Sequence, residues 1–457
     1  MNAPGLRRTL TPLQLAALGM GTTIGVGWIV VTGGWIARAG PLGAALAFLV
    51  GGAVMGLVAL CYAEAATRAP EANGEYGYVS MAFGRGWGFV VGWSALLGYV
   101  GICGFEGLAL AWLIGVLVPD FTGPTLYTSV GVPVRLLDLA VIIGGALFFT
   151  AINYFGARES ARVQVAVTVG KVLLSFGFVA IGFAGGTPVN LEPGFLPAEA
   201  PWHGVLAVLV MVPAWFCGFN ALPQALGEAR ERPSARALAG LLGMVILLTT
   251  LFYVAVITAT AFAAPRGVLD GAELPVVAAM EAVAGPWGGR IVLVAGVVAL
   301  LSAWNAAMFA ASRLLYALAR DGALPSALAH VHPKNGTPAN AVLFVGVIAL
   351  LGGLVGRAFI EPLVQIGALG FAVAFIGACL SSLALRRGAG GGTAAGGFPV
   401  AAAWVGALAL AGVAIYSAWT ILADAGERLP EAAALALWAG LGAAMWAFAR
   451  ARRPRVS

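Results

Sequence analysis

Residues 19–28 read GMGTTIGVGW and interrupt an apolar stretch that runs from about residue 12 to residue 38. Four of these ten residues are glycine and two are threonine, although glycine weakens a helix interior by about 1 kcal/mol relative to alanine. In a membrane, such a break is tolerated where the freed backbone groups are buried in protein or line a wet cavity. The stretch therefore predicts an unwound helix, although small residues that let two helices pack closely explain it equally well when it stands alone.

The composition of the whole chain places this stretch in a lipid bilayer. Of 457 residues, 61% are hydrophobic and only 10% are charged, which is typical of a polytopic membrane protein. The apolar runs are long and lack two-residue alternation, so they predict an all-α helical bundle rather than a β-barrel. We expect 12 transmembrane helices, at about 12–38, 41–67, 86–118, 136–155, 161–185, 201–227, 236–263, 288–319, 339–357, 361–385, 398–422 and 430–449.

The basic residues predict the orientation of these helices. Arginine is concentrated in alternate connections, on the side that also carries both ends of the chain, and the net charge is +6. Cytoplasmic connections carry an excess of arginine and lysine, so both termini are expected in the cytoplasm. This explains the positive charge without a nucleic acid partner. Abundant alanine, glycine and arginine favour a bacterial inner membrane, and the first helix is too long for the core of a signal peptide.

Residues that carry enzyme chemistry are sparse. The four cysteines lie inside predicted helices and form no C-x-x-C pair, and the three histidines show no H-E-x-x-H spacing. No glycine-rich phosphate loop accompanies them. We therefore predict no metal site and no cofactor, and we predict that the protein is not an enzyme.

A second interrupted helix favours a binding site over close helix packing as the explanation of the first interruption. Residues 212–224 read VPAWFCGFNALPQ, where Pro213, Gly218 and Pro223 bracket Asn220. Breaks at corresponding positions of two five-helix halves indicate an inverted-repeat transporter with its site near the middle of the membrane. We expect one permease domain over residues 1–457, with broken helices 1 and 6, repeat halves at about 12–185 and 201–385, and two extra helices at about 398–449.

Several motifs along the chain resemble the amino acid-polyamine-organocation family of permeases, which has the leucine-transporter fold. They are GTTIGVGW, YAEAATRAPEANGEYGYV (62–79), NYFGARESARVQ (153–164), GEARERP (227–233) and SRLLYALARDGALP (312–325). The resemblance covers nearly the whole length. It implies that the substrate carboxylate meets amides of the first break, and that its ammonium group meets carbonyls of both breaks. A zwitterion also matches the opposite partial charges of two half-helix ends.

This resemblance maps a binding site onto the two breaks. Three aromatic residues beside the breaks, Trp28, Trp215 and Phe216, are expected to close over the substrate. Tyr99 and Cys103 on the third helix are expected to line the pocket for its side chain, although packing alone explains each of them. The predicted substrate contacts are Thr22, Thr23, Ile24, Gly25, Val26, Gly27, Tyr99, Cys103, Ala214, Trp215, Phe216, Cys217 and Asn220.

Lys171 stands out because the chain has only one other lysine, Lys334. It lies nine residues after Arg162, about 13 Å along a helix, which is close to the middle of a core about 30 Å thick. A charge at this depth is costly and indicates function, and an ammonium group can lose its proton when desolvated. A structural role as a partner for carbonyls is the alternative. The resemblance places Lys171 where sodium-coupled relatives hold sodium, which implies sodium independence and favours proton coupling.

Two acids complete the prediction. Related permeases often carry glutamate in the sixth helix at the position of Asn220, and this acid is absent here. Glu106 on the third helix lies near the middle of the membrane instead, where it is expected to bind a cationic substrate, carry the coupled proton, pair with Lys171, or form a structural hydrogen bond. Glu64 is expected to pair with a nearby arginine.

These features predict a secondary active transporter that moves an amino acid across the cytoplasmic membrane by alternating access, as a proton symporter. The main alternative is an obligate exchanger of amino acids or polyamines, and a substrate-sensing homologue with little flux is a third. We also expect Arg313, Arg320 and Asp321 to form an inner gate or to anchor a loop at a cytoplasmic helix end.

Overall fold

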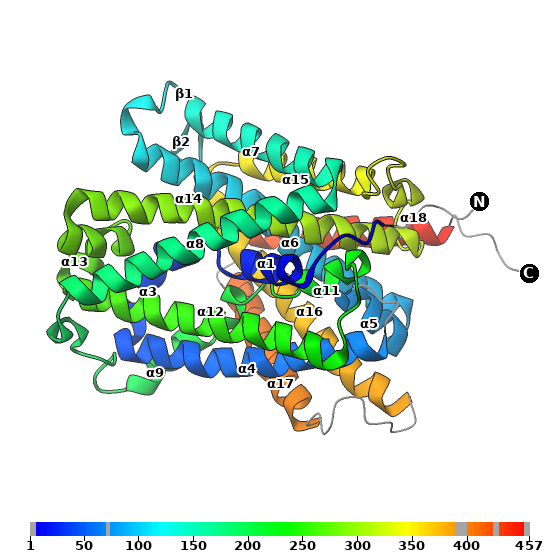
Figure 1. Ribbon diagram of the computed structural model, residues 1–457, viewed down its shortest axis with the longest axis horizontal. Helices are drawn as coiled ribbons and strands as arrows, with labels where there is room; N and C mark the ends of the chain where they lie inside the picture. The colour runs from blue at the N-terminus through cyan, green and yellow to red at the C-terminus, as the bar shows by residue number, and fades with distance from the viewer. Residues whose placement is uncertain (1–5, 70–73, 389–399, 424–428, 452–457) are drawn as a thin grey trace, which may run out of the picture.

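Long helices dominate the protein (Figure 1). The computed structural model describes residues 6–69, 74–388, 400–423 and 429–451. Within these ranges, ten helices are long and apolar enough to cross a membrane, and two further apolar helices, Pro201–Trp215 and Ala339–Leu354, are shorter. The chain is therefore an all-α polytopic membrane protein, apart from one small β-hairpin.

The first helix is interrupted where its glycines predict. Helix α1 ends at Thr23 and α2 begins at Gly27, so three residues separate the two helical segments. The elements of this half are α1 (Pro12–Thr23), α2 (Gly27–Val30), α3 (Thr32–Ala39), α4 (Pro41–Arg68), α5 (Gly74–Phe83), α6 (Arg85–Leu117), η1 (Pro119–Phe121), β1 (Thr125–Ser129), β2 (Val132–Arg135), α7 (Leu136–Phe155), α8 (Ala157–Gly185) and η2 (Pro188–Leu191).

The sixth helix is interrupted as well, between Trp215 and Ala221. The elements after η2 are α9 (Pro201–Leu209), α10 (Val212–Trp215), α11 (Ala221–Ala225), η3 (Leu226–Glu228), α12 (Ala235–Ala263), α13 (Arg266–Asp270), α14 (Pro275–Arg320), η4 (Ser326–Ala329), α15 (Ala339–Leu354), η5 (Arg357–Phe359), α16 (Ile360–Gly388), α17 (Val400–Ala423) and α18 (Leu429–Ala451).

Three elements differ from the prediction. Helix α14 begins 13 residues before the expected residue 288, because helical structure continues on both sides of a kink at Gly285, whose φ is 66°, and Pro286. Helix α5 is additional, and it lies in the connection between the second and third predicted transmembrane helices. Strands β1 and β2 pair antiparallel around Val130 and Gly131, and Gly131 supplies the positive φ of 76° that such a turn requires.

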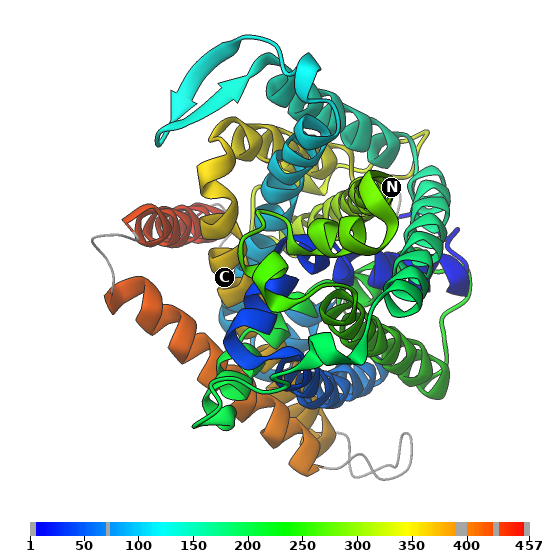
Figure 2. The same cartoon turned by 90° about the vertical axis from the view of Figure 1, so that its left-hand side faces the viewer.

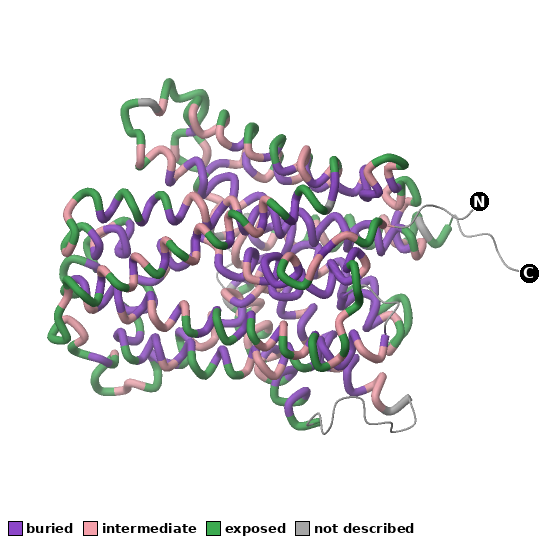
Figure 3. Tube along the Cα trace, viewed as in Figure 1, coloured by how far each residue is buried: buried purple, intermediate pink, exposed green. Residues whose placement is uncertain are grey.

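The interrupted helices lie inside the bundle, and the last two helices lie outside it. Viewed along the bundle, α17 and α18 lie at its edge (Figure 2). Residues in the centre of the bundle are mostly buried, and residues at its edge are mostly exposed (Figure 3). In the most apolar part of each span, 78% of the first helix is buried but only 11% of the last. The two breaks are therefore enclosed by protein, which is what freed backbone groups in a membrane require.

The two ends of the bundle differ in what they carry. The N-terminal segment lies at one end, where Leu10 pairs with Ala229 after η3, and where α5 and α11 also lie (Figure 1). We call this the N-terminal end. The β-hairpin and α13 lie at the opposite end, which we call the hairpin end.

Candidate functional site

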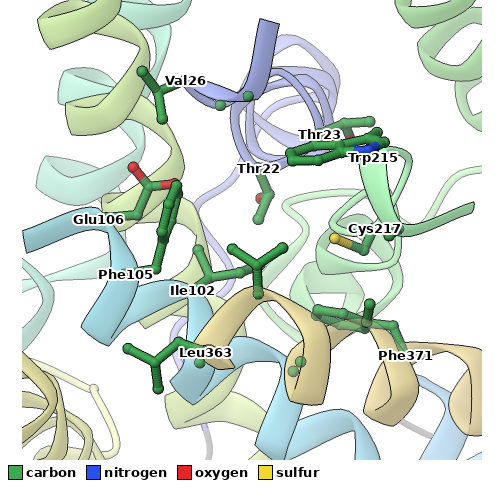
Figure 4. Close-up of a pocket in the computed structure, with 18 of the residues that line it drawn as sticks. Thr22, Thr23, Val26, Ile102, Phe105, Glu106, Trp215, Cys217, Leu363 and Phe371 are labelled. Atoms are coloured by element: carbon green, nitrogen blue, oxygen red, sulfur yellow. The ribbon is translucent and has the colours of Figure 1, made fainter. Parts of the chain in front are cut away.

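The two breaks meet at a cavity of about 60 Å³, which has room for roughly four water-sized atoms. The first break contributes Thr22, Thr23, Gly25, Val26 and Gly27, and the second contributes Ala214, Trp215 and Cys217. Figure 4 shows side chains from the two breaks, from α6 and from α16 converging on this space. Thus segments that are about 190 residues apart in the sequence share one small site.

Unpaired amide groups mark the first break. The hydroxyl groups of Thr22 and Thr23 donate back to the carbonyls of Leu18 and Gly19, at 2.9 and 2.7 Å, and so stabilise the end of α1. Beyond them, the N–H groups of residues 25–27 donate no hydrogen bond within the described residues. Buried N–H groups are almost always paired, so these three are available to a ligand in the cavity.

The second break supplies the complementary groups. The carbonyls of Trp215 and Cys217 accept no hydrogen bond in the described part of the chain, whereas the carbonyl of Ala214 accepts the N–H of Cys217 at 3.4 Å. Gly218 has a φ of 112°, and a Cβ there would lie 2.4 Å from the Cβ of Thr22. Only glycine fits this position, because the two breaks touch there. The site thus presents free amides on one segment and free carbonyls on the other.

The other walls come from helices that sequence reasoning largely missed. Helix α6 adds Gly98, Gly101, Ile102 and Phe105, helix α12 adds Tyr253, and α16 adds Leu363, Val364, Gly367, Ala368 and Phe371. The glycine spacing in GYVGICG (98–104) is a signal for close packing on α6. On α16 the apolar residues look like any buried helix face, so nothing in the sequence marked them.

Five predicted contacts do not line the cavity. Tyr99 is fully buried and packs edge-on against Phe371, with ring centroids 4.9 Å apart. Cys103 and Phe216 are also fully buried, Ile24 turns its carbonyl toward Lys171, and Asn220 is engaged with Glu75 of α5. Their contact with substrate stays a prediction.

Lys171 on α8 reaches the first break with its ammonium group. Nζ donates to the carbonyls of Met20, Gly21 and Ile24 at 3.1, 3.0 and 2.7 Å, and to the hydroxyl of Ser302 on α14 at 3.1 Å. The side chain is 1% exposed. One cation therefore holds the carbonyl side of the break and ties α8 and α14 to α1.

Glu106 borders the cavity beside the same break. It is 2% exposed, and Oε1 lies 3.3 Å from the position of a Cβ on Gly25. Oε2 has no hydrogen-bond partner among the described residues, and no ion pair joins the carboxyl group to Lys171 in the described structure. Because buried carboxyl oxygens are normally paired, Glu106 has capacity for a ligand group or a proton.

Trp215 covers the cavity next to Gly27. A Cβ on Gly27 would lie 2.2 Å from Cζ3 of Trp215, so the indole packs directly on the glycine. Trp35 supports the indole edge-on, with centroids 5.5 Å apart. Tyr253 closes the adjacent wall and donates to the carbonyl of Thr23 at 3.4 Å. The absence of a side chain at residue 27 therefore fixes how closely the two breaks approach.

Three ion pairs of the described residues lie at the N-terminal end, outside the cavity. Arg313 of α14 pairs with Glu228 of η3 at 2.6 Å, and both side chains are 1% exposed. Glu64 pairs with Arg68 at 2.6 Å, as predicted. Arg320 pairs with its neighbour Asp321 at 3.1 Å in a more exposed setting. Among the residues that the structure describes, no cluster of three or more His, Cys, Asp or Glu is suited to a metal ion.

Comparison with known proteins identifies the relatives of this chain. A family model described as amino acid permease matches residues 10–447. The branched-chain amino acid permease BcaP of Bacillus subtilis is 28% identical over 84% of this chain and 82% of its own length. The methylthioribose transporter of the same organism is 28% identical over 84% and 82%. The vacuolar cationic amino acid transporter 2 of Arabidopsis thaliana is 31% identical over 83% of this chain and 60% of its own length.

Proposed function

The chain belongs to the amino acid permease family, within the amino acid-polyamine-organocation superfamily, and we propose that it carries an amino acid across a cell membrane by alternating access. The observation that carries this proposal is the pairing of free groups across one enclosed cavity. Amides of residues 25–27 offer hydrogen bonds to a carboxylate, and carbonyls of Trp215 and Cys217 accept hydrogen bonds from an ammonium group. Both groups are common to all α-amino acids.

The cavity walls support recognition of the substrate side chain by α6 and α16. Gly98, Gly101 and Gly367 leave space, while Ile102 and Leu363 provide apolar contacts. In this mainly apolar wall, Glu106 is the one acidic side chain among the described lining residues. The space left by the three glycines favours a substrate with a small or apolar side chain, and a proton or a substrate amine satisfies the carboxyl group of Glu106.

Coupling to protons, without sodium, is the mechanism that we propose. The ammonium group of Lys171 occupies carbonyl oxygens of the first break, which are the hard ligands that a sodium ion would need. Loss of its proton would remove three charge-assisted hydrogen bonds from the break. Proton movement at Lys171, with Glu106 as a nearby acid, therefore changes how strongly the two half-helices are held.

For the topology we propose 12 crossings of a bacterial inner membrane, with both termini in the cytoplasm. The interrupted stretch α9 to α11 and the shorter helix α15 add two crossings to the ten longer helices. Each repeat half then begins with a broken helix, at 12–39 and 201–225. In this arrangement the N-terminal end is the cytoplasmic end, and α17 and α18 lie outside the repeat.

Uptake into proteoliposomes tests the function directly. Purified protein in empty vesicles is given a radiolabelled amino acid and an imposed pH gradient, acidic outside, with and without sodium. We expect accumulation that needs the pH gradient and is unaffected by sodium. Uptake only into vesicles preloaded with amino acid would instead identify an exchanger. To select the substrate, thermal shifts are measured first, because a ligand at 100 times its Kd stabilises the folded state by about 2.7 kcal/mol.

A further inference from the structure

A second buried carboxyl group lies outside the cavity, on α5. Glu75 has no exposed surface, although α5 is not among the ten candidate membrane spans and connects α4 to α6 at the N-terminal end. Its two oxygens accept hydrogen bonds from neutral amides of the sixth-helix segment. Asn220 Nδ2 donates to Oε1 and Gln224 Nε2 donates to Oε2, each at 3.0 Å.

These hydrogen bonds connect Glu75 to the second break. The other end of the Asn220 amide, Oδ1, accepts the N–H of Gly218 at 3.1 Å. Gly218 is the residue of the second break that packs against Thr22, a cavity residue of the first break. A path of three direct contacts therefore runs from the carboxyl group, through Asn220 and Gly218, to the cavity wall.

The surroundings of Glu75 provide no compensating cation. Within the described residues no arginine or lysine forms an ion pair with it, and the nearby arginines of α4 and α14 pair with other acids. Burial is the main reason that the pKa of Glu75 is raised to about 7 from its usual 4.5. Other titratable and charged groups surround α5. Those at the N-terminal end, on α5 and on the elements packed against it, include Cys61, Tyr62, Glu64, Arg68, Tyr76, Tyr78, Arg85, Tyr99, Arg232, Arg313, Tyr316, Arg320, Asp321, Cys379 and Arg386.

The local polar groups suit both protonation states. In the arrangement described, two N–H donors face the carboxyl group, which fits its ionised form. Gln224 Oε1 has no hydrogen-bond partner among the described residues. Rotation of the Gln224 amide would turn this oxygen toward Glu75, where it accepts the proton of the neutral form. Asn220 cannot rotate in the same way without losing its bond from Gly218.

We propose that Glu75 is a proton-binding site that is loaded while α5 and α11 are packed together and is emptied when this contact opens to the cytoplasm. The direction follows from burial. The closed contact disfavours the charged form, whereas water around an opened contact stabilises it. Protonation therefore favours the closed N-terminal end, and a rise in cytoplasmic pH favours its opening. This proposal rests on the alternating access proposed above and assigns an additional proton to the same cycle.

The test uses Cys217 as a reporter of opening, because it lies in the cavity wall. The other cysteines, Cys61, Cys103 and Cys379, are replaced by alanine, and Cys217 is labelled with a membrane-impermeant maleimide in inside-out vesicles without substrate. Labelling rates are measured from about pH 5.5 to about pH 8 in this parent and in its Glu75→Gln variant. Dividing the parent rate by the variant rate at each pH cancels the intrinsic pH dependence of the thiol reaction.

We expect this ratio to rise at least tenfold across the range, because a site with a pKa near 7 when closed and near 4.5 when hydrated couples opening to proton release. The matched control is Glu64→Gln, which neutralises a buried acid at the same end that is already paired with Arg68. The ratio of parent to control should stay constant with pH. A constant ratio for Glu75→Gln, or a ratio that falls as pH rises, would overturn the proposal.

Asn220→Asp gives an independent test that does not depend on the folding of Glu75→Gln. It places a second carboxyl group at hydrogen-bonding distance from Glu75, and two such groups hold a shared proton to higher pH. We expect the labelling transition of this variant to move up by about one pH unit, and an unmoved transition contradicts the assignment. Because labelling needs no substrate, a normal pH response without amino acid uptake would refute the transport function and leave the proton site standing.

Discussion

Replacing Gly27 with alanine tests whether the close approach of the two breaks creates the binding site. The added Cβ would lie 2.2 Å from Cζ3 and 2.6 Å from Cε3 of Trp215. Ordinary van der Waals contact begins near 3.4 Å, so the indole must retreat by more than 1 Å or the first break must move. Both changes displace groups that line the cavity.

The size of the effect follows from the cost of overpacking. One extra methyl group in a well-packed interior costs about 1–3 kcal/mol, and each 1.4 kcal/mol is a factor of ten in affinity. Because Gly27 and Trp215 both line the cavity, an indole that moves to avoid the new methyl group occupies substrate space and has to be moved back on binding. If that cost is paid on binding, Gly27→Ala weakens amino acid binding by about 5- to 150-fold. The same overpacking lowers the stability of the folded state by about 1–3 kcal/mol, so the unfolding temperature of Gly27→Ala is measured beside that of the wild type to show that the variant is folded.

Isothermal titration of purified protein with the amino acid identified by thermal shift measures this loss. Gly34→Ala is the matched control, because it lies in the following helix α3 and a Cβ there meets nothing within 4 Å. Its affinity should stay within about threefold of the wild type, which is below 1 kcal/mol. Wild-type affinity in Gly27→Ala would refute the idea that the contact between Gly27 and Trp215 shapes the site.

Three further predictions address the buried charges. Lys171→Ala removes the ammonium group from three carbonyls of the first break. Uptake driven by a pH gradient should therefore be lost while exchange persists, and sodium should not restore uptake. Concentrative uptake at the wild-type rate would leave Lys171 with only a structural role. If the carboxyl group of Glu106 carries a proton, Glu106→Gln should flatten the pH dependence of uptake. If the carboxyl group binds cationic substrates, the same variant should selectively weaken their binding. An unchanged pH profile together with an unchanged substrate range contradicts both roles. The raised pKa of Glu75 means that the folded state holds a proton more tightly than the unfolded state, so its contribution is complete below pH 4.5 and is lost as pH rises to about 7. Denaturant unfolding should therefore show wild type losing about 3 kcal/mol relative to Glu75→Gln between these values, and parallel pH profiles would argue against a titrating Glu75.

Part of the candidate site could be predicted from the sequence, because the two helix breaks are caused by residues that lie within the breaks themselves. Glycine and proline weaken helices wherever they stand, so GMGTTIGVGW and VPAWFCGFNALPQ mark both breaks. The depth of Lys171 and of Glu106 follows from counting residues along a helix. By contrast, Leu363 and Phe371 of α16 line the cavity although their sequence context is that of an ordinary apolar helix.

What the sequence by itself determined is therefore the set of local properties: a chain too apolar for water, helices of membrane length, and two places where helical hydrogen bonding fails. Only the tertiary structure decided which groups meet. It directs Lys171 to carbonyls about 150 residues away, leaves Tyr99 and Cys103 out of the cavity lining, and brings Glu75 to Asn220. Such contacts depend on the rotation and crossing of whole helices, which packing sets through many small contributions spread over the chain. No short stretch of residues encodes them.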